Sequence, residues 1–92
     1  MVRLEIRGEV VVLPRAPVER AQQLAHRQAG VSSRLRDLAL VLDWALNSTR
    51  VVSLRRSEAR ELERLAEREP QLGELAEILL GPGRAERTAR AA

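Results

Sequence analysis

The stretch VVSLRRSEARELERLAEREP, residues 51–70, passes from a short strand-like run into a charged helical pattern that ends at a proline. Its apolar residues recur every three or four positions, which places them on one face of a helix. These residues are Ala59, Leu62, Leu65 and Ala66. A strand and a helix of this length bury little apolar surface by themselves. The stretch therefore predicts a unit that packs against another part of the chain or against a second copy.

A second helix follows this stretch and completes a strand–helix–helix pattern. The strand covers residues 51–54, and Ser57 is the predicted cap of a helix over about 58–69. Pro70 ends that helix because proline has no backbone N–H to continue it. The last predicted helix covers about 71–80. Its apolar face is formed by Leu72, Leu75, Ala76 and Leu79.

The N-terminal residues predict a β-hairpin. Residues 2–6 alternate between apolar and charged side chains, and a turn at Gly8 joins them to a second run, residues 10–13. This second run is continuously apolar, which favours a more buried strand than the first. The first following helix covers about 17–28, where Pro17 suits the first helical turn.

A second helix in this half of the chain begins near Ser32 or Ser33, one of which caps it, and runs to about Leu46. Residues 38–46, LALVLDWAL, are apolar nearly all round. A helix with this profile is buried on most sides, which in a short chain indicates a subunit interface. The interface candidates are Leu38, Val41, Leu42, Trp44 and Ala45.

The two strand–helix–helix runs align without a gap at an offset of 41 residues. Over the 30 pairs from Val10/Val51 to Ala39/Leu80, eight are identical. Because neither unit buries its apolar side alone, the alignment predicts that repeat one, residues 10–46, packs against repeat two, residues 51–80, with their strands paired.

The composition predicts one small α+β domain, mostly helical, over residues 1–80 and a disordered basic tail over 81–92. A chain of 92 residues with one aromatic side chain has a small core, which favours a homodimer or higher oligomer. All basic residues are arginines, and the net charge of +3 is uneven. Residues 1–57 carry +5 (10 − 5), 58–80 carry −4 (3 − 7) and 81–92 carry +2 (3 − 1), so an anionic partner is expected away from 58–80.

Several function classes find no support in the residues. The chain has no cysteine, no glycine-rich phosphate loop and no nucleophile placed with a base, so we expect neither an enzyme nor a metal or cofactor site. His26 is expected to be solvated, and Asp43, if buried, is expected to pair with an arginine. No apolar run reaches the roughly 20 residues that cross a bilayer, and the start is not a secretory signal. We therefore expect a cytoplasmic protein that does not contact a membrane.

The pattern of residues 10–40 and 51–80 resembles the unit of ribbon–helix–helix DNA-binding proteins, in which strands of two units pair as an antiparallel ribbon. The resemblance implies a tandem, single-chain version. It also implies that outward strand side chains read bases in the major groove and that the start of the second helix holds phosphate. The nucleic-acid candidates under this interpretation are Arg3, Arg7, Ser53 and Arg55 on the strands, and Ser32, Ser33, Arg34 and Arg36 at the helix start.

Three functions remain open from the sequence. The first is a DNA-binding regulator of the ribbon–helix–helix type that self-associates and has a partner-binding half, as in antitoxins or phage repressors. The second is a protein-docking or assembly adaptor that uses the apolar helix 38–46 and binds no nucleic acid. The third is an RNA-binding accessory protein, which the scarcity of aromatic stacking residues disfavours.

Overall fold

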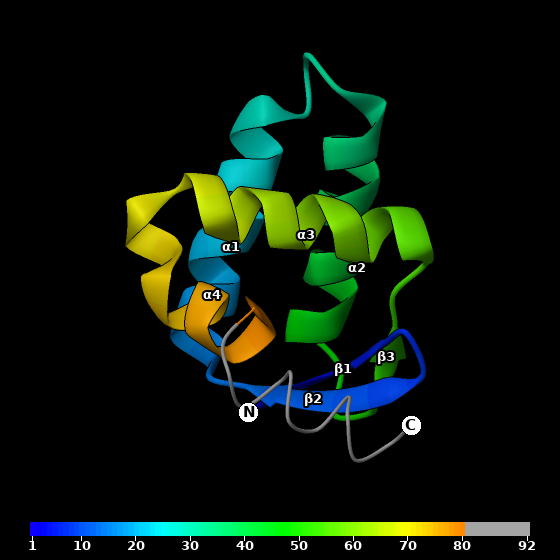
Figure 1. The fold of residues 1–92 in the computed structure, drawn as a ribbon. Coiled ribbons are helices and arrows are strands. Elements are labelled where there is room, and N and C mark those ends of the chain that lie inside the picture. Colours follow the sequence, from blue (N-terminus) through cyan, green and yellow to red (C-terminus); the bar gives the residue numbers. More distant parts are fainter. Residues whose placement is uncertain (81–92) are drawn as a thin grey trace.

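The computed structural model describes residues 1–80, which form an α+β fold with helices on one face of a small sheet (Figure 1). The predicted fold class is confirmed, and the predicted tail, residues 81–92, lies outside the described residues. In chain order the elements are β1 (Val2–Ile6), β2 (Glu9–Leu13), α1 (Arg15–Gln28), α2 (Ser33–Leu46), β3 (Val52–Ser53), α3 (Arg56–Arg68), the 3₁₀ turn η1 (Pro70–Leu72) and α4 (Gly73–Leu80).

The predicted hairpin is formed by β1 and β2, which a two-residue turn joins. Arg7 and Gly8 both have positive φ, 53° and 80°. Turns with two left-handed residues match the right-handed twist of the flanking strands. Gly8 adopts this conformation freely because it has no Cβ, whereas an arginine does so at some cost.

Strand β1 is the centre of the sheet, whose order is β2-β1-β3. It pairs antiparallel with β2 and parallel with β3. The prediction that the strands of the two repeats pair directly is therefore wrong within this chain, because β1 lies between them. Strands β1 and β2 are joined by only two residues, so the entropic cost of pairing them is small, whereas β3 is distant in the sequence. Strand β1 therefore pairs with β2, and β3 pairs with the other edge of β1. The family resemblance itself stays a prediction.

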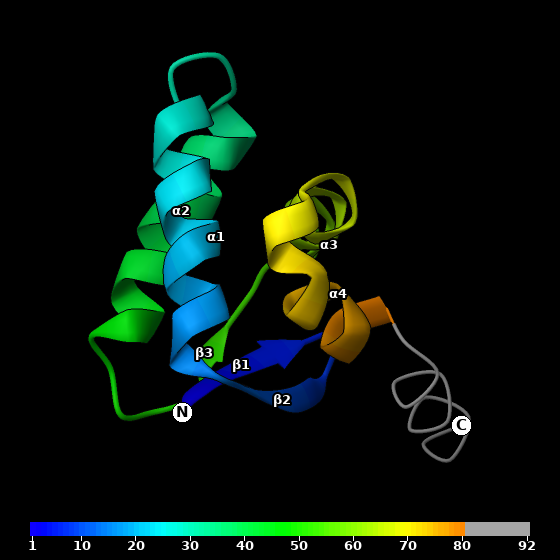
Figure 2. The ribbon, with the colours of Figure 1, turned by 90° about the vertical axis from the view of Figure 1, so that its left-hand side faces the viewer.

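Strand β2 buries only one of its two faces, although its continuous apolar run predicts a more buried strand than β1. Val11 and Leu13 face the helices and are fully buried, whereas Val10 and Val12 are about half exposed on the outer face of the sheet. All the helices of residues 1–80 lie on the other side (Figure 2). A continuous apolar run therefore does not distinguish a central strand from this edge strand.

The starts of α2 and α3 show two different caps. Ser32 caps α2, because its hydroxyl oxygen accepts a hydrogen bond from the backbone N–H of Leu35 at 3.3 Å. Ser57, the predicted cap of α3, lies inside that helix. The helix begins instead after Arg55, whose backbone N–H donates to the Glu58 carboxylate at 2.7 Å. This hydrogen bond, from the backbone N–H of the cap residue to the side chain of Glu58, is one of the two that make up a capping box.

The core lies between the sheet and the helices. Helices α1 and α2 form a hairpin that stands on the sheet, and α3 and α4 lie beside it over the same face (Figure 2). Within residues 1–80 no buried residue is polar or charged. Most of the large, fully buried side chains are leucines, and the set includes Leu4, Ile6, Leu13, Leu38, Leu42, Leu62, Leu65, Leu72, Leu75 and Leu79.

The two repeats bury equivalent positions in their strands and first helices. The matched buried pairs are Val11/Val52, Leu13/Leu54, Val18/Ala59, Ala21/Leu62, Leu24/Leu65 and Ala25/Ala66. The second helices differ, since α2 has 14 residues and α4 has 8. The structural correspondence is thus strongest over the strand and the first helix of each repeat.

Candidate functional site

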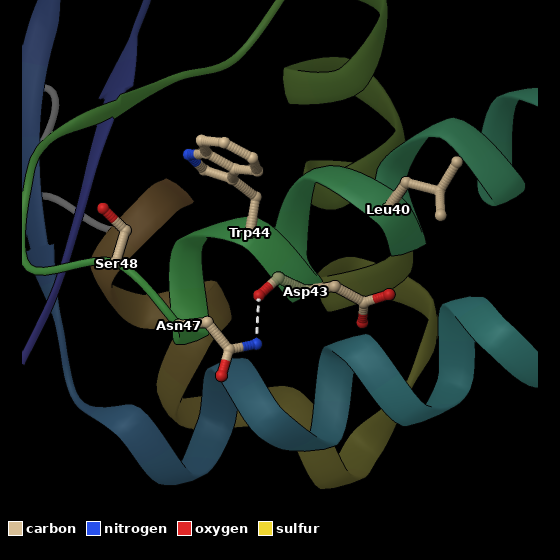
Figure 3. Close-up of a pocket in the computed structure, with 5 residues that line it drawn as sticks. All are labelled: Leu40, Asp43, Trp44, Asn47 and Ser48. Carbon is tan, nitrogen blue, oxygen red and sulfur yellow. Dashed lines mark hydrogen bonds between the residues drawn. The ribbon is translucent and has the colours of Figure 1, made fainter.

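Two large apolar side chains stand exposed on α2. Trp44, the one aromatic residue of the chain, is 70% exposed, and Leu40, one turn earlier, is 58% exposed. They line a groove of about 420 Å³ together with Asp43, Asn47 and Ser48. In Figure 3 Trp44 points away from α1, on the opposite side of α2. We call Leu40 and Trp44 the α2 ridge.

The remaining interface candidates serve the core of the chain itself. Leu38, Leu42 and Ala45 are at most 2% exposed, so they are not available to a partner. Val41 is half-buried and packs against the core. Of the five candidates, only Trp44 lies on a surface that a partner can reach. The sequence missed Leu40, although its spacing of four residues from Trp44 places both on one helix face.

Asp43 lies beside the ridge and holds α2 against α1. Its carboxylate accepts a hydrogen bond from the side-chain amide of Gln22 at 2.5 Å, and His26 Nε2 lies 2.8 and 3.0 Å from its two oxygens. His26 is exposed, as predicted, but it has an acidic partner that the sequence did not indicate. Asp43 is half-buried, and its partners are a histidine and a glutamine rather than the predicted arginine.

The environment of Asp43 shifts its pKa. Burial raises the pKa, but the hydrogen bonds from Gln22 and His26 and the charge of His26 lower it by more, so the net pKa lies below its usual value. The ionised carboxylate therefore contributes stability at neutral pH. That contribution is present above the unfolded-state pKa of about 3.9 and is lost as the pH falls through the lower folded-state value.

We expect Asp43→Asn to lower the free energy of unfolding by about 1 kcal/mol at pH 7, because charge-assisted hydrogen bonds become neutral ones. The difference from the unmodified protein should shrink as the pH falls below about 4. Urea unfolding at pH 7 and pH 3 measures this. Asp37→Asn, a change at an exposed position of the same helix, is the control and should alter stability little at either pH. A difference for Asp43→Asn that stays constant with pH would contradict the assignment.

The strand candidates for nucleic-acid binding do not form a basic surface. Arg3 and Ser53 lie exposed on the sheet, but Glu5, on the same strand as Arg3, lies opposite Ser53 and accepts a hydrogen bond from its hydroxyl at 3.0 Å. Arg7 makes a two-point ion pair with Glu63 of α3. Arg55 is exposed at the start of α3.

The helix-start candidates lie at the other end of the molecule. Ser32, Ser33, Arg34 and Arg36 are at the tip of the α1–α2 hairpin, which points away from the sheet (Figure 1). The Ser32 hydroxyl already caps α2. The structure therefore splits the predicted nucleic-acid residues into two groups at opposite ends.

A basic groove joins residues that the sequence did not connect. Arg34 of α2 lines a groove of about 290 Å³ with Arg56, Ser57, Arg60 and Glu61 of α3. Arg56 and Arg60 are absent from the predicted set because they precede or lie within the acidic segment 58–80. The available signal was the recurrence of arginine at every fourth position of α3, which puts these residues on one exposed face.

Comparisons with protein-family models, curated proteins and solved structures found no match to this chain. None of the helices formed by residues 1–80 combines the length and the apolar character that crossing a membrane requires.

Proposed function

We propose that this protein is a non-enzymatic interaction module that self-associates through the α2 ridge. The observation that carries the proposal is Trp44, which is 70% exposed on a helix whose opposite face is built into the core. Tryptophan is the residue type most enriched among the side chains that dominate binding energy in protein interfaces. An isolated exposed apolar residue needs no explanation, but here two large ones adjoin a groove.

The spacing of the ridge suits a second copy of the same helix. Leu40 and Trp44 are separated by four residues, so they lie on one face, about 6 Å apart along the axis. In an antiparallel pair with a two-fold axis midway between them, Leu40 of each copy meets Trp44 of the other. The same contact thus forms twice, as a self-complementary dimer interface requires.

The charges at the two ends of α2 favour the antiparallel arrangement. The last turn of α2 carries no basic residue, and the guanidinium of Arg15 in α1 donates to the last of its carbonyls, that of Leu46, at 2.9 Å. The partial negative charge of this end is thus offset in part by one arginine, and a second cation adds to that effect. Arg36, one turn before Leu40, is exposed. In the antiparallel pair Arg36 of each copy lies beside the carbonyl end of the other α2. A parallel pair would place Arg36 beside Arg36.

The area available to the ridge sets the strength of association. A tryptophan buries about 150–250 Å², and the exposed fraction of Trp44 leaves roughly 100–175 Å² to be covered by a partner. At about 25 cal/mol per Å² each indole contributes roughly 2.5–4.5 kcal/mol. Two ridges alone are smaller than the roughly 800 Å² per partner of a standard interface, so we expect a concentration-dependent dimer.

The test is solution mass by light scattering or sedimentation over a range of protein concentrations. The unmodified chain should approach twice 10.3 kDa as concentration rises, and the emission of its single tryptophan should shift to the blue. Trp44→Asp should remain folded, because the position is exposed, and should weaken the dimer by at least about 100-fold. In the variant dimer, each copy would press its new carboxylate at position 44 against the apolar ridge of the other copy.

Val31→Asp is the matched control, because Val31 is also an exposed apolar residue but lies in the α1–α2 turn. It should dimerise like the unmodified chain. A monomeric mass at every concentration, or an unchanged mass for Trp44→Asp, would rule out the ridge as the interface.

A further inference from the structure

We propose that the groove lined by Arg34, Arg56 and Arg60 binds the phosphate backbone of duplex nucleic acid. We call these three residues the arginine triad. The proposal is independent of self-association through the α2 ridge. It also differs from the predicted reading of bases by strand side chains, because none of the three arginines lies on a strand. Only Arg34 belongs to the nucleic-acid candidates predicted from the sequence.

The positive charge of the triad is not cancelled within the described chain. No carboxylate of residues 1–80 forms an ion pair with Arg34, Arg56 or Arg60, and all three side chains are exposed. The groove contains three arginines and one glutamate, a formal charge of +2 (3 − 1). The glutamate, Glu61, lies 3.6 Å from the guanidinium of Arg64, so part of its charge is already engaged.

Two other acids of α3 make contacts with residues outside the triad. Glu58 accepts the backbone N–H of Arg55, and Glu63 pairs with Arg7 of the hairpin turn. Their contacts leave the guanidinium groups of Arg56 and Arg60 facing solvent. The net negative charge of residues 58–80 therefore does not describe this face of the helix. The net charge of residues 58–80 predicts that an anion binds elsewhere, but Arg60, within this segment, is part of the proposed anion site.

The basic surface extends beyond one groove. Arg56 and Arg60 also line a second groove of about 500 Å³ with Arg7, Glu5, Gly8 and Leu54. The shared arginines join the two grooves into one trough that runs from the start of α2, past α3, to the β1–β2 turn. Arg64 continues the row one turn further along α3, so the Cα atoms of successive arginines are spaced about 6 Å along the axis.

The chemistry of the triad groove favours phosphate over other anions. The arginine guanidinium presents a planar set of donors that binds two phosphate oxygens at once. The hydroxyl of Ser57 adds the kind of neutral donor that often contacts phosphate. Among residues 1–80, no apolar or aromatic side chain lines this groove. These residues therefore offer neither the buried apolar anchor that an acidic protein partner would use nor the stacking platform that a single strand would use. Binding is restricted to the backbone and is independent of sequence.

The experiment measures fluorescence anisotropy of labelled random-sequence DNA and RNA duplexes with the full chain at about 50 and 200 mM salt. We expect binding that weakens steeply with salt, because each phosphate contact contributes about −0.9 to the slope of log K against log salt. The triple change Arg34→Gln, Arg56→Gln and Arg60→Gln should weaken binding at least tenfold. It should also reduce that slope by about 2–3.

The matched control is the triple change Arg20→Gln, Arg27→Gln and Arg50→Gln, which removes the same charge from exposed arginines that line neither groove. It should retain most of the affinity and the slope. Equal losses in both triple variants would overturn the proposal, as would an unmodified chain that binds neither duplex or binds polyglutamate instead. Circular dichroism and solution mass, taken on every variant, should match the unmodified chain and so separate this result from a failure of the α2 ridge proposal.

Discussion

Leu42→Ala is expected to lower the free energy of unfolding by about 2–5 kcal/mol, the range for removing a leucine side chain from a packed core. Leu42 is fully buried on the face of α2 that meets the sheet and the other helices. The loss is a large fraction of the total stability of a domain this small. Thermal or urea unfolding in dilute protein, where the chain is monomeric, measures it, and Tm should fall by about 10 °C or more.

Leu40→Ala is the matched control, because it makes the same change two residues away on the same helix. Leu40 is 58% exposed, so its truncation should cost less than about 1 kcal/mol in the monomer. The same variant should weaken the proposed dimer. If the two variants were equally stable in dilute solution, the assignment of core and surface on α2 would be wrong.

The local elements of this fold are readable from the sequence because their signals are local. The alternation in residues 2–6 and the glycine at position 8 predict the hairpin. The helical periods and the breaks at Gly30 and Pro70 predict the helices to within about two residues at most ends. Each signal depends only on neighbours along the chain, which is why none required the tertiary fold.

The pairing of strands and the faces of α2 are not readable in the same way. Nothing in residues 51–54 distinguishes pairing with β1 from pairing with β2, since a strand of this length carries too short a pattern of apolar residues to select one neighbour. On α2, residues 38–46 are apolar nearly all round, so the period that normally marks the buried face is weak. Only the positions of the sheet and α3 decide that Leu42 is core and Trp44 is surface.

The side-chain contacts of the candidate sites depend on the packing of separate helices. His26 and Asp43 are 17 positions apart and meet only because α1 and α2 pack as a hairpin. The arginine triad likewise combines the start of α2 with the first turns of α3. The row of arginines on α3 was visible in the sequence, but a solvated, salt-bridged face accounts for such a row equally well until the neighbouring helix is placed.

Val11→Asp is expected to unfold the chain at neutral pH. Val11 is 1% exposed under the helices, so the change removes buried apolar surface worth about 1.5–3 kcal/mol and places a carboxylate where no described side chain offers it a partner. The cost of burying an unpaired charge adds several kcal/mol. Together the two losses are as large as the whole free energy of unfolding of a domain of this size. Far-ultraviolet circular dichroism and the spread of amide proton shifts report the loss.

Val12→Asp, the neighbouring change on the same strand, should leave the chain folded. Val12 is 46% exposed on the outer face and lies opposite Arg3 of β1. The new carboxylate stays in water, and a cross-strand pair with Arg3 offsets part of the lower strand propensity of aspartate by about 0.2–1 kcal/mol. A strand buried on both faces would make both variants unfold. One folded and one unfolded variant would instead establish that the outer face of the sheet is open to solvent.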